Sequence, residues 1–152
     1  MKRLIVLISV ILISIISCEK DKPEKEKTTC FTEIDTVKAN SSIINKWSFV
    51  GYIDTTENCK PDSFPEINIE FIDSTVFRGF DGCNGYNGKY EILSDNKLHT
   101  IGVIGTTIFC AEIYSWEIKF IDGLRYSKSY KIQGKRLWID NENGYKLVFK
   151  QI

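Results

Sequence analysis

The chain has 152 residues, of which 20 are basic, 20 are acidic and one is histidine. This even balance argues against a nucleic-acid-binding protein, which needs a concentrated basic surface. Residues 30–152 suit one domain with a single core, and an aromatic content of 12% supplies the bulk to fill it.

The first 17 residues have the pattern of a bacterial secretory signal peptide. Lys2 and Arg3 precede an apolar and serine run from Leu4 to Ser17, whose 14 residues are fewer than the roughly 20 that a membrane-spanning helix needs. The junction at residues 15–18 resembles the lipobox of bacterial lipoproteins, whose cysteine is acylated and becomes the new N-terminus. Cys18 is therefore predicted to anchor an envelope lipoprotein, in the outer membrane, on its periplasmic or surface face.

Residues 18–29 are predicted to form a charged tether. Every residue from Glu19 to Lys27 except Pro23 is charged, so the segment cannot bury enough apolar surface to fold. The stretch is similar to signals with which some Bacteroidetes-type bacteria send lipoproteins to the cell surface, and a solvated spacer explains the same residues. Loss of the signal peptide leaves 18 basic against 20 acidic residues.

Beyond the lipobox, four cysteines remain: Cys30, Cys59, Cys83 and Cys110. Export places them where disulfides persist, and four cysteines allow three connectivities. We favour Cys83 with Cys110 and Cys30 with Cys59, because each pair closes a moderate loop and contributes roughly 3–4 kcal/mol in the chain-entropy model. A zinc site is disfavoured, since there is no CxxC spacing and His99 is the only histidine.

Eight segments alternate apolar and polar residues, as strands with one buried face do. In the first segment, Trp47, Phe49, Gly51 and Ile53 are expected to share the buried face. The segments are residues 47–53, 67–73, 74–80, 89–93, 97–104, 129–132, 136–139 and 145–149. Eight short strands spaced by turn signals indicate a β-sandwich or a closed barrel.

Residues 110–126 break the two-residue period. Ile113, Trp116, Phe120 and Leu124 recur at steps of three and four residues, which is the pattern of an amphipathic helix. We expect this helix to cover an open end or face of the sheet. A partner-binding groove along its apolar stripe is the alternative.

The stretch GFDGCNGYNGKY, residues 79–90, carries a glycine at every third position. Asp81-Gly82, Asn84-Gly85 and Asn87-Gly88 tolerate positive φ, so we expect the chain to turn, bulge and turn again. A phosphate loop is disfavoured because the Lys-Ser/Thr pair is missing, and an EF-hand is disfavoured because its terminal glutamate is missing. The glycines are therefore expected to shape the backbone.

Cys83 with His99 is the candidate pair for a cysteine hydrolase. Against this interpretation stand the oxidising compartment, three other cysteines ready to pair and the lack of an evident oxyanion-hole segment. The sequence thus predicts no catalytic, metal or cofactor site.

The order of these motifs resembles the META domain, the family of the heat-shock lipoprotein HslJ, over roughly residues 44–150. The matching residues are Gly82, Cys83 and Asn84 in one turn, Gly88 and Tyr90, Thr106 four residues before Cys110, a helix with Glu117, Phe120 and Leu124, and two closing strands. The resemblance implies a compact, mainly antiparallel, barrel-like β-fold with one α-helix. It also implies an envelope lipoprotein, linked in some bacteria to heat and antibiotic stress, with no established enzymatic activity.

The chain is accordingly predicted to be a monomeric, non-enzymatic envelope lipoprotein without a cofactor. It would contact the membrane through its lipid, bind no nucleic acid, and serve stress tolerance or bind an envelope partner. The alternative is an inhibitor-like or ligand-capturing module for a protein or a cell-wall fragment, with exposed aromatic residues such as Tyr52, Tyr86 or Trp138 as contacts. Cys30 and Cys59 depart from the family's common pattern and suggest an additional disulfide that fixes the N-terminal arm to the barrel.

Overall fold

The computed structural model describes residues 42–54, 58–60 and 63–152. The predicted signal peptide, Cys18, the tether and Cys30 lie outside these ranges. The elements are β1 (Lys46–Ile53), β2 (Asn68–Phe71), β3 (Val76–Phe80), β4 (Gly85–Ile92), the 3-10 turn η1 (Ser94–Asn96), β5 (Leu98–Gly105), α1 (Tyr114–Arg125), β6 (Ser127–Gln133), β7 (Arg136–Asn141) and β8 (Lys146–Gln151). Each predicted strand and the predicted helix has its counterpart in this series.

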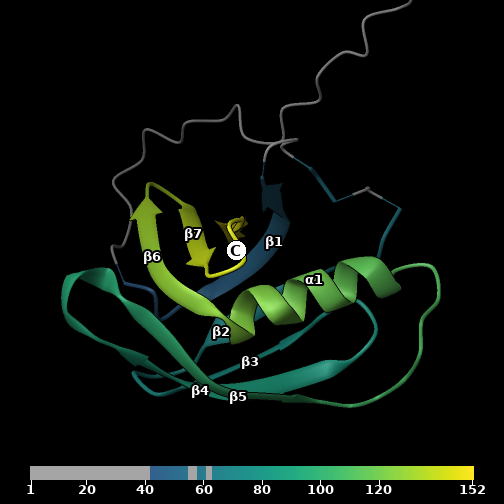
Figure 1. Cartoon of the computed structure of the whole chain (residues 1–152), viewed down its shortest axis with the longest axis horizontal. Coiled ribbons are helices and arrows are strands. Elements are labelled where there is room, and N and C mark those ends of the chain that lie inside the picture. The colour runs from purple at the N-terminus through teal and green to yellow at the C-terminus, as the bar shows by residue number, and fades with distance from the viewer. Residues whose placement is uncertain (1–41, 55–57, 61–62) are drawn as a thin grey trace, which may run out of the picture.

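The strands form a single antiparallel sheet in the order β5-β4-β3-β2-β1-β8-β7-β6, which curls around α1 (Figure 1). The first strand pairs with the last, so β1 lies in the middle of the sheet between β2 and β8. The two edge strands, β5 and β6, approach each other and are linked by a bridge between Lys97 and Ser129. The result is a nearly closed barrel with one helix, which confirms the predicted fold class.

Helix α1 connects β5 to β6 and covers the seam between them. The hydroxyl of Thr100 on β5 donates to the carbonyl of Leu124, 2.6 Å away, and lies 3.1 Å from the carbonyl of Arg125. Carbonyls in the last turn of a helix lack an intrahelical partner, so this contact satisfies the helix end and attaches it to the sheet edge. No helix in the described ranges is long and apolar enough to span a bilayer.

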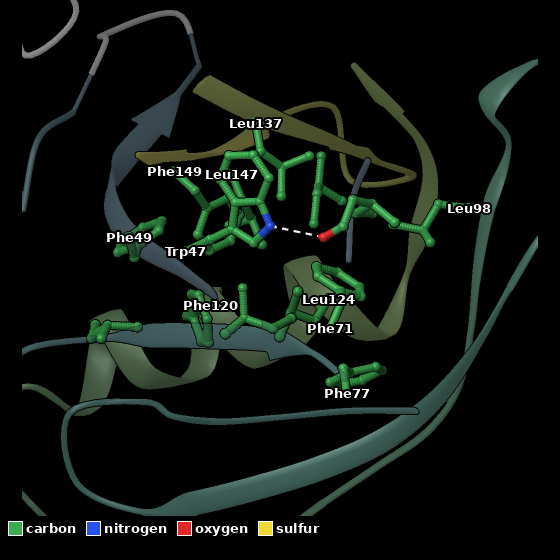
Figure 2. Packing of buried hydrophobic residues seen from close by; sticks show 14 of the residues in the cluster. Trp47, Phe49, Phe71, Phe77, Leu98, Phe120, Leu124, Leu137, Leu147 and Phe149 are labelled. Carbon is green, nitrogen blue, oxygen red and sulfur yellow. Dashed lines mark hydrogen bonds between the residues drawn. The ribbon is translucent and has the colours of Figure 1, made fainter. Parts of the chain in front are cut away.

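The core lies between α1 and the inner face of the sheet, and aromatic rings fill much of it (Figure 2). The ring of Phe49 meets those of Tyr52, Phe120 and Phe149 edge-on, at centroid distances of 5.0, 5.1 and 5.6 Å. Trp47 is fully buried, and its indole N–H donates to the Ile43 carbonyl at 2.9 Å, so its burial leaves no unpaired donor. The centre of the barrel is therefore packed with side chains and is not an open ligand cavity.

The predicted alternation in β1 holds up to Phe49 and then fails. A register shift between Phe49 and Gly51 marks a β-bulge, after which Tyr52 occupies the inner face and is 2% exposed. The Tyr52 hydroxyl donates to the carbonyl of Trp116 at 2.8 Å. Gly51 is buried against residues 58–60, where a Cβ would lie 2.7 Å from the backbone oxygen of Asn58. The expected inward position of Gly51 was wrong because one inserted residue reverses the faces.

Glycines on the inner face of β3 and β4 make room for aromatic rings. A Cβ on Gly88 would lie 2.5 Å from the Phe77 ring, and a Cβ on Gly79 would lie 2.5 Å from the Tyr86 hydroxyl oxygen. The Tyr86 ring crosses Gly79, and its hydroxyl donates to the Asn68 carbonyl at 2.7 Å. The close packing of this part of the barrel depends on those absent side chains.

A single turn replaces the predicted succession of turns in residues 79–90. Gly82 has a φ of 100° between β3 and β4, as expected. Gly85 and Gly88 lie inside β4 without positive φ, so the turns predicted at those glycines were wrong. The predicted bulge is present at the register shift after Gly88, where Gly102 (φ 66°) is the extra residue on β5.

Replacing Gly88 by alanine is expected to lower the free energy of unfolding by about 1–3 kcal/mol, because the methyl group overlaps the Phe77 ring and the Gly102 carbonyl oxygen. Gly85→Ala is the matched control on the same strand, since a Cβ there meets no described atom within 4 Å. Urea unfolding of both variants measures the difference, and equal stabilities would contradict this role of Gly88.

Candidate functional site

The turn between β3 and β4 is built on a buried carboxylate. Asp81 is 2% exposed, and one of its carboxylate oxygens accepts hydrogen bonds from the backbone N–H groups of Cys83 (2.9 Å) and Asn84 (2.6 Å). The Asp81 N–H donates to the Asn84 carbonyl at 3.0 Å. The positive φ of Gly82 completes the reversal. This turn places the Asn84 side chain against the segment that leads from β5 to α1.

Asn84 joins three parts of the chain through one buried side chain, which is 1% exposed. Its amide nitrogen donates to the Ile108 carbonyl and to the Glu117 carboxylate, both at 2.9 Å. Its amide oxygen accepts from the Thr106 hydroxyl (2.7 Å) and from the Ile108 N–H (2.8 Å). The amide thus uses two donors and two acceptor positions, its full capacity. We call Asp81, Asn84, Thr106 and Glu117 the amide hub.

A disulfide between Cys83 and Cys110 ties the same two segments covalently, with their Cα atoms 6.0 Å apart. This is the first of the two pairs favoured from the sequence. Its ends are 27 residues apart, for which the chain-entropy model gives a stabilisation of about 3.5 kcal/mol. Cys59 is also disulfide-bonded. Its predicted partner Cys30 lies outside the described residues, so the second pair stays a prediction.

The disulfide also decides the question of a catalytic cysteine. The nucleophile in cysteine catalysis is a thiolate, and Cys83 carries none while it is bonded to Cys110. His99 lies on the exposed face of β5 opposite Glu91. A hydrolase built on Cys83 and His99 is contradicted by this arrangement.

Glu117, in the first turn of α1, is held where its charge is poorly solvated. One carboxylate oxygen accepts from Asn84, and the other is buried with no hydrogen-bond partner among the described residues. Burial raises the pKa of Glu117 above its ordinary value of 4.5, and the charge of Asp81 raises it further, while the hydrogen bond from Asn84 lowers it. The hub therefore carries an electrostatic cost in its charged form.

The loop that the hub holds, together with the end of β5 before it and the start of α1 after it, carries a series of exposed apolar side chains. We call this series the apolar tip; it consists of Ile104, Ile108, Phe109, Tyr114 and Ile118, which are between 42% and 70% exposed. The rings of Phe109 and Tyr114 meet edge-on at 5.2 Å, and Ile118 follows Tyr114 on the same side of α1. Clusters of exposed apolar residues mark interaction sites.

A shallow hollow of about 190 Å³ lies beside the start of α1, lined by Tyr52, Asn58, Ser115, Trp116 and Lys119. The rings of Tyr52 and Trp116 are stacked at 5.0 Å, and the Lys119 ammonium lies 4.5 Å from the centroid of the Tyr52 ring. Lys119 also pairs with Asp54 at 2.9 Å. The hollow offers an aromatic edge and polar groups, but its volume suits only a small ligand group.

The residues that carried the family resemblance turn out to have structural positions. Asn84 and Thr106 belong to the hub, and Gly82 supplies the positive φ of the turn that carries Asn84. Gly88 and Tyr90 line the barrel interior, where the Tyr90 hydroxyl donates to the carbonyl of Asp73. The described residues contain no group of three or more His, Cys, Asp or Glu side chains that could hold a metal ion.

The three aromatic residues predicted to contact a ligand, Tyr52, Tyr86 and Trp138, differ in their exposure. Tyr52 and Tyr86 are buried, so their expected exposure was wrong, and Trp138 is half-buried. The apolar tip was missed. Its signal was the run of 14 residues from Leu98 to Ala111 without Lys, Arg, Asp or Glu, in a chain in which 26% of residues are charged.

Comparison with known proteins gives one family and a set of similar folds. A family model described as the META domain matches residues 44–152. An NMR structure of a protein from Burkholderia xenovorans superposes with a TM-score of 0.57 at 20% identity, over 72% of this chain and 82% of that one. A crystal structure of a DUF4847 family protein from Bacteroides vulgatus gives a TM-score of 0.52 at 16% identity, over 70% and 92%. At these identities the likeness shows the fold. Comparison with curated proteins finds no match.

Asn84→Ala is expected to lower the free energy of unfolding by about 2–4 kcal/mol, because it removes four hydrogen bonds made by a buried side chain, two of them with part-buried groups of Thr106 and Ile108. Asn87→Ala, on the exposed side of the same strand, is the matched control and should cost under about 0.5 kcal/mol. Urea unfolding measures both. Hydrogen exchange at the Ile108 N–H adds a local readout, and unchanged protection there would contradict the role of Asn84.

Glu117→Gln is expected to stabilise the protein near neutral pH and to lose this advantage in acid. The pKa of Glu117 is raised on folding, so its contribution to stability is fully present below the ordinary value of 4.5 and is lost as pH rises through the folded pKa. The glutamine variant cannot ionise and escapes that loss. Unfolding free energies between pH 4 and pH 7 measure the difference.

Glu112→Gln, at an exposed position of the same segment, serves as the control for the pH series. It should change the unfolding free energy by under about 0.5 kcal/mol across the range. A Glu117→Gln advantage that is constant with pH, or that grows in acid, would show that ionisation of Glu117 is not its cause.

Proposed function

Because the chain belongs to the META-domain family, we propose that it is a non-enzymatic envelope lipoprotein, anchored through lipid on Cys18, which supports the envelope under stress by presenting a rigid binding surface. The observation that carries this proposal is the amide hub. The Asn84 side chain has its full set of hydrogen bonds inside the protein, and Cys83 is held in a disulfide. The residues that the family resemblance singles out are thus engaged in holding the fold.

An oxidising location outside the cytoplasm is supported by two independent features. The lipobox-like junction at Cys18 follows a signal-like apolar run. In the described part of the chain, Cys83, Cys110 and Cys59 are all disulfide-bonded, a state that persists mainly in exported proteins. These features support our proposal that lipid on Cys18 holds the domain at the outer membrane, facing either the periplasm or the exterior.

The binding role is supported by the rigidity of the apolar tip. Ile108 is hydrogen-bonded to Asn84 through both its N–H and its carbonyl, and Cys110 is bonded covalently to β3–β4 turn residue Cys83. A surface that is already ordered loses little conformational entropy when it binds. Exposed Phe109 and Ile108 then supply the apolar area that association removes from water.

The small hollow at Tyr52 and Trp116 favours a second candidate, a ligand-capturing module for a cell-wall fragment. Trp116, whose ring stacks on the buried Tyr52, lies with Asn58 and Lys119 around the hollow, and this combination of an aromatic ring and polar groups suits a planar or sugar-like group. Fluorescence titration with cell-wall fragments tests it, because Trp116 lines the hollow. Saturable quenching would support this candidate, and an unchanged signal up to millimolar ligand would remove it.

Cys18→Ala is expected to move the protein from the membrane fraction to the soluble fraction of the envelope, because alanine lacks the thiol to which the proposed lipid is attached. Mass spectrometry of the N-terminal peptide of the wild-type protein should show the acyl chains directly on Cys18. The double variant Cys83→Ala, Cys110→Ala is the control, which should stay in the membrane fraction. An unacylated wild-type Cys18 would refute the anchor.

A further inference from the structure

We propose that the apolar tip inserts into the lipid bilayer at which the protein resides, so that the domain lies against the membrane through a second contact. Ile104, Ile108 and Phe109 come from the end of β5 and the following loop, and Tyr114 and Ile118 come from the start of α1. This inference rests on the proposed function, because the first contact with the membrane is the proposed lipid on Cys18.

The composition of the tip fits hydrocarbon better than a protein surface. The 14 residues from Leu98 to Ala111 contain no Lys, Arg, Asp or Glu. Protein interfaces surround their apolar core with a polar rim, whereas the interior of a bilayer excludes charged side chains altogether. The side chains with the greatest exposure in the tip, Phe109 and Ile104, are 70% and 69% exposed, so most of their apolar surface is open to lipid.

Backbone satisfaction is the second argument for lipid. A segment that enters hydrocarbon cannot leave N–H or carbonyl groups unpaired, because no water is available there. Both backbone groups of Ile108 are paired with the Asn84 side chain, and the Thr106 N–H donates to the Gly85 carbonyl at 3.1 Å. At Ile108 the loop therefore presents its side chain while both of its polar backbone groups are paired inside the protein.

The chain between the anchor and the domain is long enough for both contacts to reach one bilayer. Residue 42, where the described domain begins, follows Cys18 by 24 residues, which span about 80 Å when extended. The predicted tether alone, 12 residues, spans about 40 Å. A compact domain of this size is about 35 Å across. The tip can therefore face the bilayer wherever the tether joins the barrel.

The charges around the tip limit how deeply it inserts and which lipids it prefers. Glu112 is exposed just beyond the disulfide, whereas the Glu117 carboxylate is directed to Asn84. The nearest lysines along the chain, Lys97 and Lys119, flank the uncharged run at some distance. Insertion is therefore shallow, driven by apolar burial, and does not require anionic lipid or low salt.

Photolabelling of the full mature protein in vesicles of phosphatidylcholine tests the proposal. A trace of phosphatidylcholine with a diazirine in its acyl chain marks the residues that enter hydrocarbon, and mass spectrometry of peptides locates the label. Labels are expected in residues 104–118. Phe109→Asp should reduce this label about tenfold or more, because it replaces apolar burial by a charge, while the protein stays attached through its lipid.

Ile92→Asp is the matched control, since Ile92 is 43% exposed at the far end of β4 from the hub and receives the same change. It should leave the tip label unchanged. The proposal would be overturned if wild-type protein attached to vesicles carried no label in residues 104–118. If the tip also crosslinked to an envelope protein in cells, its partner would be that protein and not lipid. If Cys18 of the wild-type protein carries no lipid, the proposed anchor is refuted. The proposed insertion of the apolar tip is tested separately, because label in residues 104–118 of such protein would still support it.

Discussion

One buried amide, that of Asn84, sets the arrangement on which the rest of this surface depends. A buried amide must find partners for two N–H donors and an oxygen, and the partners here come from the β5–α1 segment and from the helix itself. That requirement places Thr106, Ile108 and Glu117 around one side chain. The Cys83–Cys110 disulfide then closes the same junction covalently, so the loop has little freedom left.

Helix α1 transmits this local constraint to the whole barrel. Its first turn carries Glu117 into the hub, and the next turns place Phe120 and Leu124 in the core, both fully buried. Gly123 lets the helix approach β8 so closely that a Cβ would lie 2.9 Å from a Leu147 methyl group. Helix α1 also covers the seam between β5 and β6. The same helix therefore contacts the hub, the core and the two edge strands that close the sheet.

The sequence was informative wherever a local pattern decides local structure. Period-two alternation located the strands, the three-and-four spacing around Phe120 located α1, and the Asp81-Gly82 pair located a real turn. It failed where distant contacts decide. The bulge after Phe49 reverses the inner face of β1, and the partners of Asn84 lie 22 to 33 residues away. Neither can be read from a window of neighbouring residues, since both are selected by tertiary packing.

The exposed Ile108 and Phe109 are a liability for a domain free in water, because exposed apolar clusters promote association. The proposed arrangement removes that liability. An anchored domain encounters its own bilayer at a high effective concentration, so a weak apolar contact that would be negligible in solution becomes populated. It also explains why so much rigid structure supports so short a loop: a flexible loop would fold its apolar side chains onto the barrel, whereas the hub and the disulfide hold them outward.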